Sequence, residues 1–350
     1  MRYKIDRNHK ITRFLCLLLG MILLTGSMCI PVYAAEYWPE GPEVVSPNVI
    51  VMEASTGTVL YDRDSLEAHY PASITKIMTT LIALENSDLN DIVTFSDAAI
   101  DNTEGSGIAR DYGEQMTMEQ CLYAVMLASA NECAYAVAEH VGGTIENFVA
   151  MMNEKAKELG CQNTHFANPH GLHDENHYTC CYDMALIARA AYQNETFRII
   201  VGTARYTIPP TNKHAEQTDL QNHNEMLYPF QTNKYVYDGC TGGKTGYTNA
   251  ANSTLVTYAE RDGMTLICVV MNTQSPNQWL DSRNLFDYCF DNFQLFNIAE
   301  NETNYTSAEQ KMQAHSIQMN RLWILTKMQV LYFQRQRSFP MRRQKLSMTM

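Results

Sequence analysis

The chain has 350 residues, of which 45% are hydrophobic and 18% are charged. This composition allows a sizeable buried core in one large domain or two smaller ones, and it excludes an intrinsically disordered protein. The formal net charge of −12 argues against binding to nucleic acid, because such proteins neutralise phosphates with clustered Lys and Arg.

Residues 1–34 have the pattern of a secretory signal peptide. A basic head precedes an apolar run over residues 14–30, which is short for a membrane span. Val32 and Ala34 then supply the small residues of a cleavage site. An uncleaved N-terminal anchor is the alternative, and either interpretation implies that the following domain, residues 36–300, is exported.

The first elements of the domain are two β-runs, at residues 49–53 and 58–62, joined by a turn at Gly57. Pro71 fits the first turn of a buried helix, because apolar residues follow it at helical spacing. Residues 87–193 are mostly helical in pattern. Thr117 and Gln120 predict a capping box, and a helix over residues 145–159 ends at Gly160.

After residue 200 the hydrophobic period falls to two. This indicates β-runs near residues 205–208, 235–238, 253–258 and 265–271, followed by a helix over residues 278–290. Strands at both ends with helices between them predict an α+β fold. Its antiparallel sheet is covered by helices from both ends of the domain.

Eight cysteines follow the signal segment, and most lie within apolar helical or strand patterns. Free cysteine in such places behaves as a small hydrophobic residue, although export would permit disulfides. No CxxC pair suggests structural zinc.

Residues 301–350 form an atypical basic tail with eight Lys or Arg and two Glu. The tail could be a basic helix in peripheral contact with a membrane. Its apolar residues hold no clean helical period, so we favour a disordered or frame-shifted segment.

The stretch YPASITKIMTT, residues 70–80, places Ser73 and Lys76 on one face of a helix. Among apolar neighbours an ammonium group is poorly solvated, which lowers the pKa of a lysine. A partly neutral Lys76 can accept the proton of Ser73, which makes Ser73 the candidate nucleophile. The SxxK spacing alone also arises by chance in a chain of this length.

A second motif, GGKTGYT at residues 242–248, follows a β-run. Lys244 and Thr245 would offer a cation and a hydroxyl to a substrate carboxylate, and Gly246 would let another backbone approach closely. A solvated turn is the alternative.

A third motif, SAN at residues 129–131, lies between helices. Ser129 could relay a proton and Asn131 could hold the substrate backbone. Helix-end capping is the alternative, and two other SxN triplets occur at residues 46–48 and 275–277.

In this order the three motifs resemble those of the serine penicillin-recognising enzymes. Residues 45–295 are similar to the D-alanyl-D-alanine carboxypeptidases among the low-molecular-mass penicillin-binding proteins. The segments that carry this likeness are STGTVLYDRD, PASITKIMT, SANECAYAVAEHVGG, NPHGLHDENHYTCCYDMALIARA, GGKTGYT and LFDYCF. The resemblance implies a β-lactamase/transpeptidase-like α/β (α+β) fold with an inserted, mostly helical subdomain.

The resemblance also implies an acyl-transfer reaction on a peptidoglycan stem peptide that ends in D-Ala-D-Ala, without a cofactor or metal. Ser73 would attack the penultimate carbonyl, Lys76 would accept its proton, and Ser129 would protonate the departing D-Ala. β-Lactams would acylate the same serine and block it.

The binding roles implied by the resemblance fall mostly on the KTG strand. Lys244 and Thr245 would hold the terminal carboxylate, and the backbone N–H groups of Ser73 and Tyr247 would stabilise the oxyanion. One departure stands out, because relatives commonly carry an arginine where this chain has Gln278, with Arg283 a turn later. This departure puts carboxylate affinity in doubt.

Three other functions are consistent with parts of the sequence. His165, His170, His173 and His177 could suggest a zinc peptidase, although no HExxH pattern is present. A β-lactamase shares the motifs, but its deacylating glutamate is matched only loosely, by ENSDLN at residues 85–90. A non-catalytic penicillin-binding wall protein is supported only by Gln278 and the tail.

Overall fold

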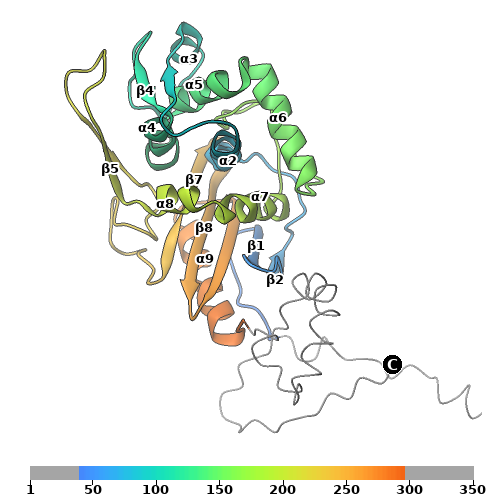
Figure 1. The fold of residues 1–350 in the computed structure, drawn as a ribbon. Helices are drawn as coiled ribbons and strands as arrows, with labels where there is room; N and C mark the ends of the chain where they lie inside the picture. Colours follow the sequence, from blue (N-terminus) through green and yellow to red (C-terminus); the bar gives the residue numbers. More distant parts are fainter. Residues whose placement is uncertain (1–38, 296–350) are drawn as a thin grey trace, which may run out of the picture. The chain divides into compact units, whose positions relative to one another are not determined.

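A five-stranded antiparallel sheet forms the centre of the fold in the order β2-β1-β9-β8-β7 (Figure 1). The computed structural model describes residues 39–295, so the predicted signal peptide and the basic tail lie outside the described residues. The first strand, β1, pairs with both β2 and the last strand, β9, which places β2 and β7 at the two edges. The strands are β1 (Asn48–Glu53), β2 (Val59–Arg63), β7 (Cys240–Thr248), β8 (Asn252–Arg261) and β9 (Met264–Thr273).

Both faces of the sheet are buried. In β1, Ile50 and Met52 contact one hydrophobic core, whereas Val49 and Val51 contact the other, because successive side chains of a strand point to opposite faces. The helix α9 (Asn277–Asn292) packs on one face, against β8 and β9. The predicted cover of the sheet by the closing helix is confirmed.

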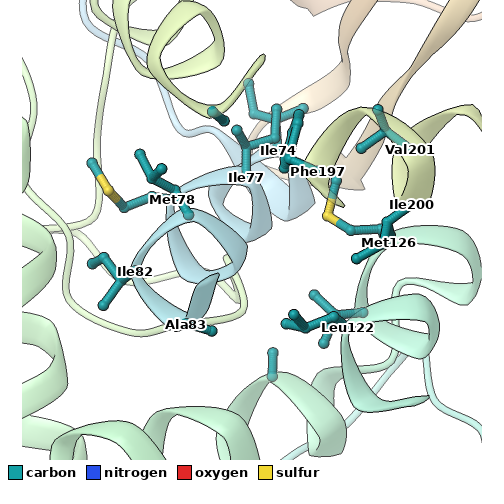
Figure 2. Packing of buried hydrophobic residues seen from close by; sticks show 14 of the residues in the cluster. Ile74, Ile77, Met78, Ile82, Ala83, Leu122, Met126, Phe197, Ile200 and Val201 are labelled. Carbon is teal, nitrogen blue, oxygen red and sulfur yellow. The ribbon is translucent and has the colours of Figure 1, made fainter. Parts of the chain in front are cut away.

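The opposite face supports α7 (Cys181–Gln193), which packs on β1 and β9, and α2 (Lys76–Asn86), which packs on α7. Figure 2 shows Ile77 and Ile82 of α2 among side chains from the neighbouring helices, including Leu122 and Phe197. All of these side chains are buried, so α2 is held on several sides.

The helical insertion predicted between the strands is present. Thr117 and Gln120 form the predicted capping box, and α6 ends before Gly160 as expected. Chain segments in and beside this region are η2 (Ala72–Thr75), β3 (Ile92–Thr94), α3 (Asp97–Asp101), β4 (Gln115–Thr117), α4 (Met118–Tyr123), η3 (Ala124–Ala128), α5 (Asn131–Gly142), α6 (Ile145–Glu158), α8 (Glu195–Gly202), β5 (Arg205–Ile208) and β6 (Thr218–Gln221).

The strand predicted at residues 235–238 is wrong, because this stretch is a loop. Tyr237 is buried against Phe286 of α9 and donates a hydrogen bond to Asp287 at 2.8 Å, so its apolar contacts are made without strand pairing.

The strand β7 begins only after that loop. Its two adjacent glycines interrupt the alternation of side chains by which a strand is recognised in a sequence. A Cβ on Gly242 would lie 2.6 Å from the Val201 carbonyl oxygen of α8, and one on Gly243 would overlap the Val256 carbonyl oxygen of β8. Glycine is therefore required where the backbones of α8 and β8 approach this strand.

The eight cysteines between residues 39 and 295 are free thiols. Most are buried, and burial raises the pKa of Cys268 to about 12. These thiols serve as small apolar core residues, as expected from the patterns around them.

Candidate active site

The candidate nucleophile lies in a tight turn between β2 and α2. Ser73 is part of the 3₁₀ segment η2, and Lys76 is the first residue of α2. Lys76 Nζ lies 3.1 Å from Ser73 Oγ. The structure thus brings the two side chains into hydrogen-bond contact, as the three-residue spacing predicts.

Lys76 has three oxygen neighbours and no exposure to solvent. Besides Ser73, Nζ contacts Asn131 Oδ1 and the His170 carbonyl oxygen, both at 2.6 Å. Burial holds the pKa of Lys76 well below its ordinary value, and the charge of Lys244 lowers it further. The nearby Glu132 carboxylate acts in the opposite direction but does not overcome burial. Lys76 is therefore suited to accept a proton near neutral pH.

The SAN motif lies at the junction of two helical segments. Ser129 adopts the left-handed conformation with φ 61° and ends η3, so that Asn131 can begin α5. Asn131 Nδ2 donates to the Glu104 carbonyl oxygen at 2.5 Å, which fixes the amide that contacts Lys76. Ser129 Oγ is buried and has no hydrogen-bond partner within the described part of the chain.

The KTG residues lie within β7, at the edge of the sheet. Lys244 is buried and donates to the Thr245 carbonyl oxygen at 2.9 Å. Burial lowers the pKa of Lys244 to about 7. A Cβ on Gly246 would lie 2.8 Å from Ser73 N, so the predicted close backbone approach at this glycine is present. The side chain of Tyr247 is 65% exposed.

Sequence reasoning assigned no site residue in the loop NPHGL, residues 168–172, although this loop contributes directly. The His170 carbonyl oxygen accepts a hydrogen bond from Lys76, and Gly171 has φ 86°. A Cβ on Gly171 would overlap the Ala72 carbonyl oxygen, so only glycine fits there. The glycine after a histidine in NPHGL was the available signal.

A cavity of about 320 Å³ lies beside Asn131. Its walls include Glu104, Ser106 and the buried Glu132. The carbonyl oxygens of Glu104 and Ser106 accept hydrogen bonds from the side chain and backbone of Asn131, respectively. The loop over residues 102–110 therefore forms a wall next to the candidate site.

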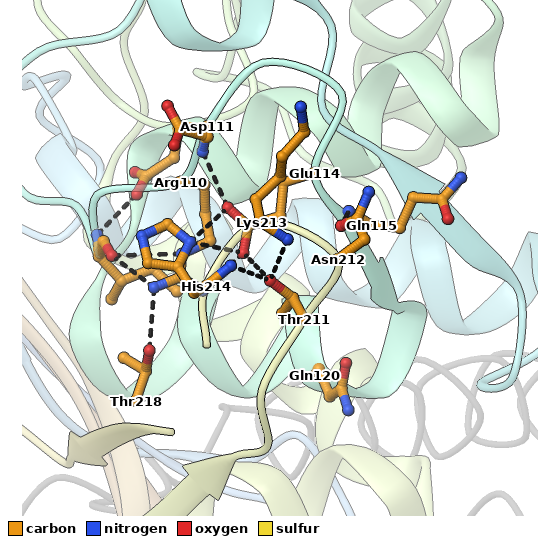
Figure 3. Close-up of polar contacts among 12 residues, drawn as sticks. Arg110, Asp111, Glu114, Gln115, Gln120, Thr211, Asn212, Lys213, His214 and Thr218 are labelled. Carbon is orange, nitrogen blue, oxygen red and sulfur yellow. Dashed lines mark hydrogen bonds and ion pairs between the residues drawn. The ribbon is translucent and has the colours of Figure 1, made fainter. Parts of the chain in front are cut away.

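A buried ion pair anchors that loop (Figure 3). Arg110 Nη1 contacts Glu114 Oε1 at 2.8 Å, and Arg110 also donates to the Ile108 carbonyl oxygen at 2.9 Å. Burial raises the pKa of Glu114, but hydrogen bonds from Asp111 and Thr211 and the charge of Arg110 outweigh it, so the pKa is lowered overall. Because Thr211 lies between β5 and β6, this network ties that hairpin to the loop.

The histidine-rich segment does not assemble a metal-ligand group. In the part of the chain that the structure describes, no three His, Cys, Asp or Glu side chains converge in a way that could hold a metal ion. His177 instead contacts Thr75 and the backbone of Ala167, and His170 Nδ1 accepts the Leu172 backbone N–H at 3.2 Å.

Gln278 lies in the first turn of α9 and is buried. Its Nε2 donates to Ser275 Oγ at 3.3 Å, while Oε1 has no hydrogen-bond partner among residues 39–295. Arg283 donates to the carbonyl oxygens of Lys234 and Val236. Its guanidinium therefore binds the loop at residues 234–236.

The fold and the three motifs define the class of this protein. An antiparallel sheet covered by helices, with a serine–lysine turn facing a KTG edge strand, is the architecture of the penicillin-binding fold. The third motif joins them through Asn131, which begins α5 and contacts Lys76.

The chain belongs to the D-alanyl-D-alanine carboxypeptidase family, whose family model matches residues 35–275. It is 35% identical over 271 residues to DacF of Bacillus subtilis, an alignment that covers 75% of this chain and 66% of DacF. It is 35% identical over 258 residues to DacB2 of Mycobacterium tuberculosis, covering 72% of this chain and 84% of DacB2.

Solved structures agree with this membership. The Streptomyces K15 DD-transpeptidase is 30% identical and covers 72% of this chain and 99% of its own, with a TM-score of 0.67. The predicted fold class is confirmed by this likeness, and the protein is a member of a serine hydrolase family.

Proposed function

We propose that this protein is a serine-type D-Ala-D-Ala carboxypeptidase that removes the terminal D-Ala from peptidoglycan stem peptides through an acyl-enzyme on Ser73. The contact of 3.1 Å between Ser73 Oγ and the buried Lys76 Nζ carries the proposal. Because burial lowers the pKa of Lys76, its amine can take the serine proton as Oγ attacks the penultimate carbonyl.

The developing oxyanion needs donors that are fixed before the reaction. The backbone N–H of Ser73 and that of Tyr247 are the proposed donors, since Ser73 N lies beside Gly246 in β7. One such donor typically contributes about 10²- to 10³-fold to the rate.

The terminal carboxylate would bind at the KTG edge. The carboxylate would stabilise the charged form of Lys244, whose pKa of about 7 leaves it only partly charged at neutral pH, and Thr245 would add a hydroxyl. Gln278 supplies a neutral amide where relatives carry a cation, so Lys244 would be the principal cation for this group.

Departure of D-Ala requires a proton on its amine. Ser129 Oγ is the proposed donor, because it is buried with no hydrogen-bond partner within the described chain and lies two residues from the amide that contacts Lys76. Water then releases the acyl-enzyme, whereas a β-lactam leaves Ser73 blocked.

The substrate places this activity on the outer face of the cytoplasmic membrane or in the cell wall, where trimming of stems takes part in peptidoglycan biosynthesis and cell shape. The signal-peptide pattern of residues 1–34 supports export. Among residues 39–295, no helix is long and apolar enough to cross a membrane.

The test combines labelling and turnover. Labelled benzylpenicillin followed by peptide mapping should mark Ser73 in the purified protein, and Ser73→Ala should abolish the adduct. The protein should also release D-Ala from diacetyl-Lys-D-Ala-D-Ala.

Each alternative predicts a different outcome of these assays. Penicillin capture without D-Ala release would indicate a binding protein. Rapid turnover of a chromogenic cephalosporin would indicate a β-lactamase. Against this alternative, Glu85 of the loosely matching ENSDLN segment forms an ion pair with Lys155 at 2.9 Å. An adduct that persists in Ser73→Ala would overturn the proposal.

A further inference from the structure

The residue before the candidate nucleophile has an unusual backbone conformation. Ala72 has φ 51°, a left-handed conformation that residues with a Cβ rarely adopt. Such a conformation persists only when the surrounding structure fixes it. The contacts of Ala72 therefore show what holds the turn at Ser73.

Two threonine hydroxyls hold this turn. Thr75 Oγ1 donates to the Ala72 carbonyl oxygen at 2.8 Å, and Thr254 Oγ1 of β8 donates to the Pro71 carbonyl oxygen at 2.8 Å. Both carbonyl oxygens immediately before Ser73 are thus occupied.

The Thr75 hydroxyl is itself oriented by His177, whose Nε2 lies 2.8 Å from Thr75 Oγ1. The other ring nitrogen, Nδ1, accepts the Ala167 backbone N–H at 2.9 Å. An acceptor at Nδ1 requires the proton of a neutral imidazole to be at Nε2. The chain of donors therefore runs from Ala167 through His177 and Thr75 to the Ala72 carbonyl oxygen.

The surroundings keep this imidazole neutral and fixed. His177 is 2% exposed and packs its ring against the edge of Phe166 at a centroid distance of 5.6 Å. Burial lowers the pKa of His177 to about 3. The ring therefore keeps one tautomer across the physiological pH range.

The Ala72–Ser73 peptide unit links this chain to the reaction. The unit is planar and trans, so its carbonyl oxygen and its N–H point in opposite directions and turn together. Gly171 closes on the carbonyl side, and Gly246 lies beside Ser73 N on the other side. A hydrogen bond that fixes the Ala72 carbonyl therefore also fixes the direction of the Ser73 N–H.

We propose that His177 is a positioning residue for the oxyanion site: through Thr75 it fixes the Ala72–Ser73 peptide unit and thereby aims the Ser73 N–H at the substrate oxyanion. This inference rests on the proposed role of Ser73 as nucleophile. His177 touches neither the substrate nor the reacting atoms.

Matched pairs of variants separate hydrogen bonding from packing. Thr75→Val keeps the shape of the side chain but removes the hydroxyl, whereas Thr75→Ser keeps the hydroxyl. His177→Met removes the donor, whereas His177→Gln offers an N–H in nearly the same place. All four, with the double variant T75V/H177M, are compared in the full-length protein.

The readouts are kcat and KM for diacetyl-Lys-D-Ala-D-Ala, the acylation rate with benzylpenicillin, and Tm. In T75V and H177M we expect kcat and the acylation rate to fall together about 10- to 100-fold, less than the loss of a whole oxyanion donor. KM should change little, because the oxyanion forms only in the transition state. The variants T75S and H177Q should recover most of the rate.

The double variant tests whether the two residues act in series, in which case it should be no slower than T75V alone. Wild-type kcat in folded T75V would overturn the proposal, as would a lower Tm in both variants with kcat unchanged. If H177M does not fold, the pair T75V and T75S gives the same decision. The result for Ser73→Ala is independent, so failure of the proposed function is recognised separately.

Discussion

Replacing Lys244 by methionine should make the protein more stable while it weakens substrate binding. The lysine is buried in β7, and its pKa of about 7 stands against an ordinary lysine value of 10.5. Methionine has a similar length and carries no charge, so it removes the cost of burying an ammonium group at that place.

The size of the gain follows from the pKa. Each pKa unit corresponds to about 1.4 kcal/mol, so a change from 10.5 to about 7 corresponds to roughly 5 kcal/mol below neutral pH. Methionine also loses the hydrogen bond to the Thr245 carbonyl oxygen, which costs about 1 kcal/mol. We therefore expect a net gain on the order of 3–4 kcal/mol.

The gain in free energy of unfolding should decrease as pH rises. Between about pH 7 and 10.5 an unfolded chain retains a proton that native Lys244 has released, so the free energy of unfolding of the wild type rises with pH in this window. The variant lacks that rise. Its advantage should be largest below about pH 7 and should vanish above about pH 10.5.

Lys76 reinforces the effect, because the charge of Lys244 lowers the pKa of Lys76. Urea unfolding of both proteins across this pH range gives the difference directly. The exposed Lys213→Met is the matched control and should stay within about 0.5 kcal/mol of wild type. Equal stability of Lys244→Met and wild type at pH 6 would refute the claim that this lysine is costly to bury.

Three further predictions concern the same region. Gly246→Ala should slow penicillin labelling at least tenfold and lower stability by about 1–3 kcal/mol, because the added methyl group would lie 2.8 Å from Ser73 N; unchanged labelling would contradict this. Arg110→Met removes the arginine partner of the buried Glu114, which keeps its contacts with Asp111, Thr211 and His214, so urea unfolding should show a loss of about 3 kcal/mol, and a loss under 1 kcal/mol would mean that the pair is not needed. The pH profile of kcat/KM should fall as pH rises through about 7, where Lys244 loses its proton, and a substrate with an amidated C-terminus should lack this fall.

Local patterns predicted most of the elements well. The capping box at Thr117 and the strand at residues 205–208 appear where the sequence places them, because the box joins residues close in sequence and the strand pairs with β6, the next strand along the chain. The strand β7 was harder to predict, since its glycines meet the backbones of α8 and β8 from distant parts of the chain. The false strand at residues 235–238 has the opposite cause, namely apolar residues buried by α9 without pairing.

The candidate site divides in the same way. Side chains with a recognisable spacing, such as Ser73 and Lys76, could be found in the sequence. The contributions of His170 and Ala72 could not, because they are made by backbone atoms that any residue carries. His177 was visible as a histidine, but its contact with Thr75 spans 102 residues and no local pattern encodes it.

The strained backbone positions that are neither glycine, Asn nor Asp lie at or beside the candidate active site. Seven non-glycine residues in the described chain have positive φ, and four of them are Asn or Asp, which tolerate it. The other three are Ala72 beside the nucleophile, Ser129 of the SAN motif, and Ala109 in the loop next to Asn131.

The two buried lysines of the described chain lie in the same region as this strain. Arg110 is paired with Glu114, whereas Lys76 and Lys244 are buried, have no carboxylate in contact among residues 39–295, and have lowered pKa values. These costs must be offset by the hydrophobic cores on the two faces of the sheet. Substitutions that relax this turn and edge strand should therefore stabilise the protein at the expense of acyl transfer.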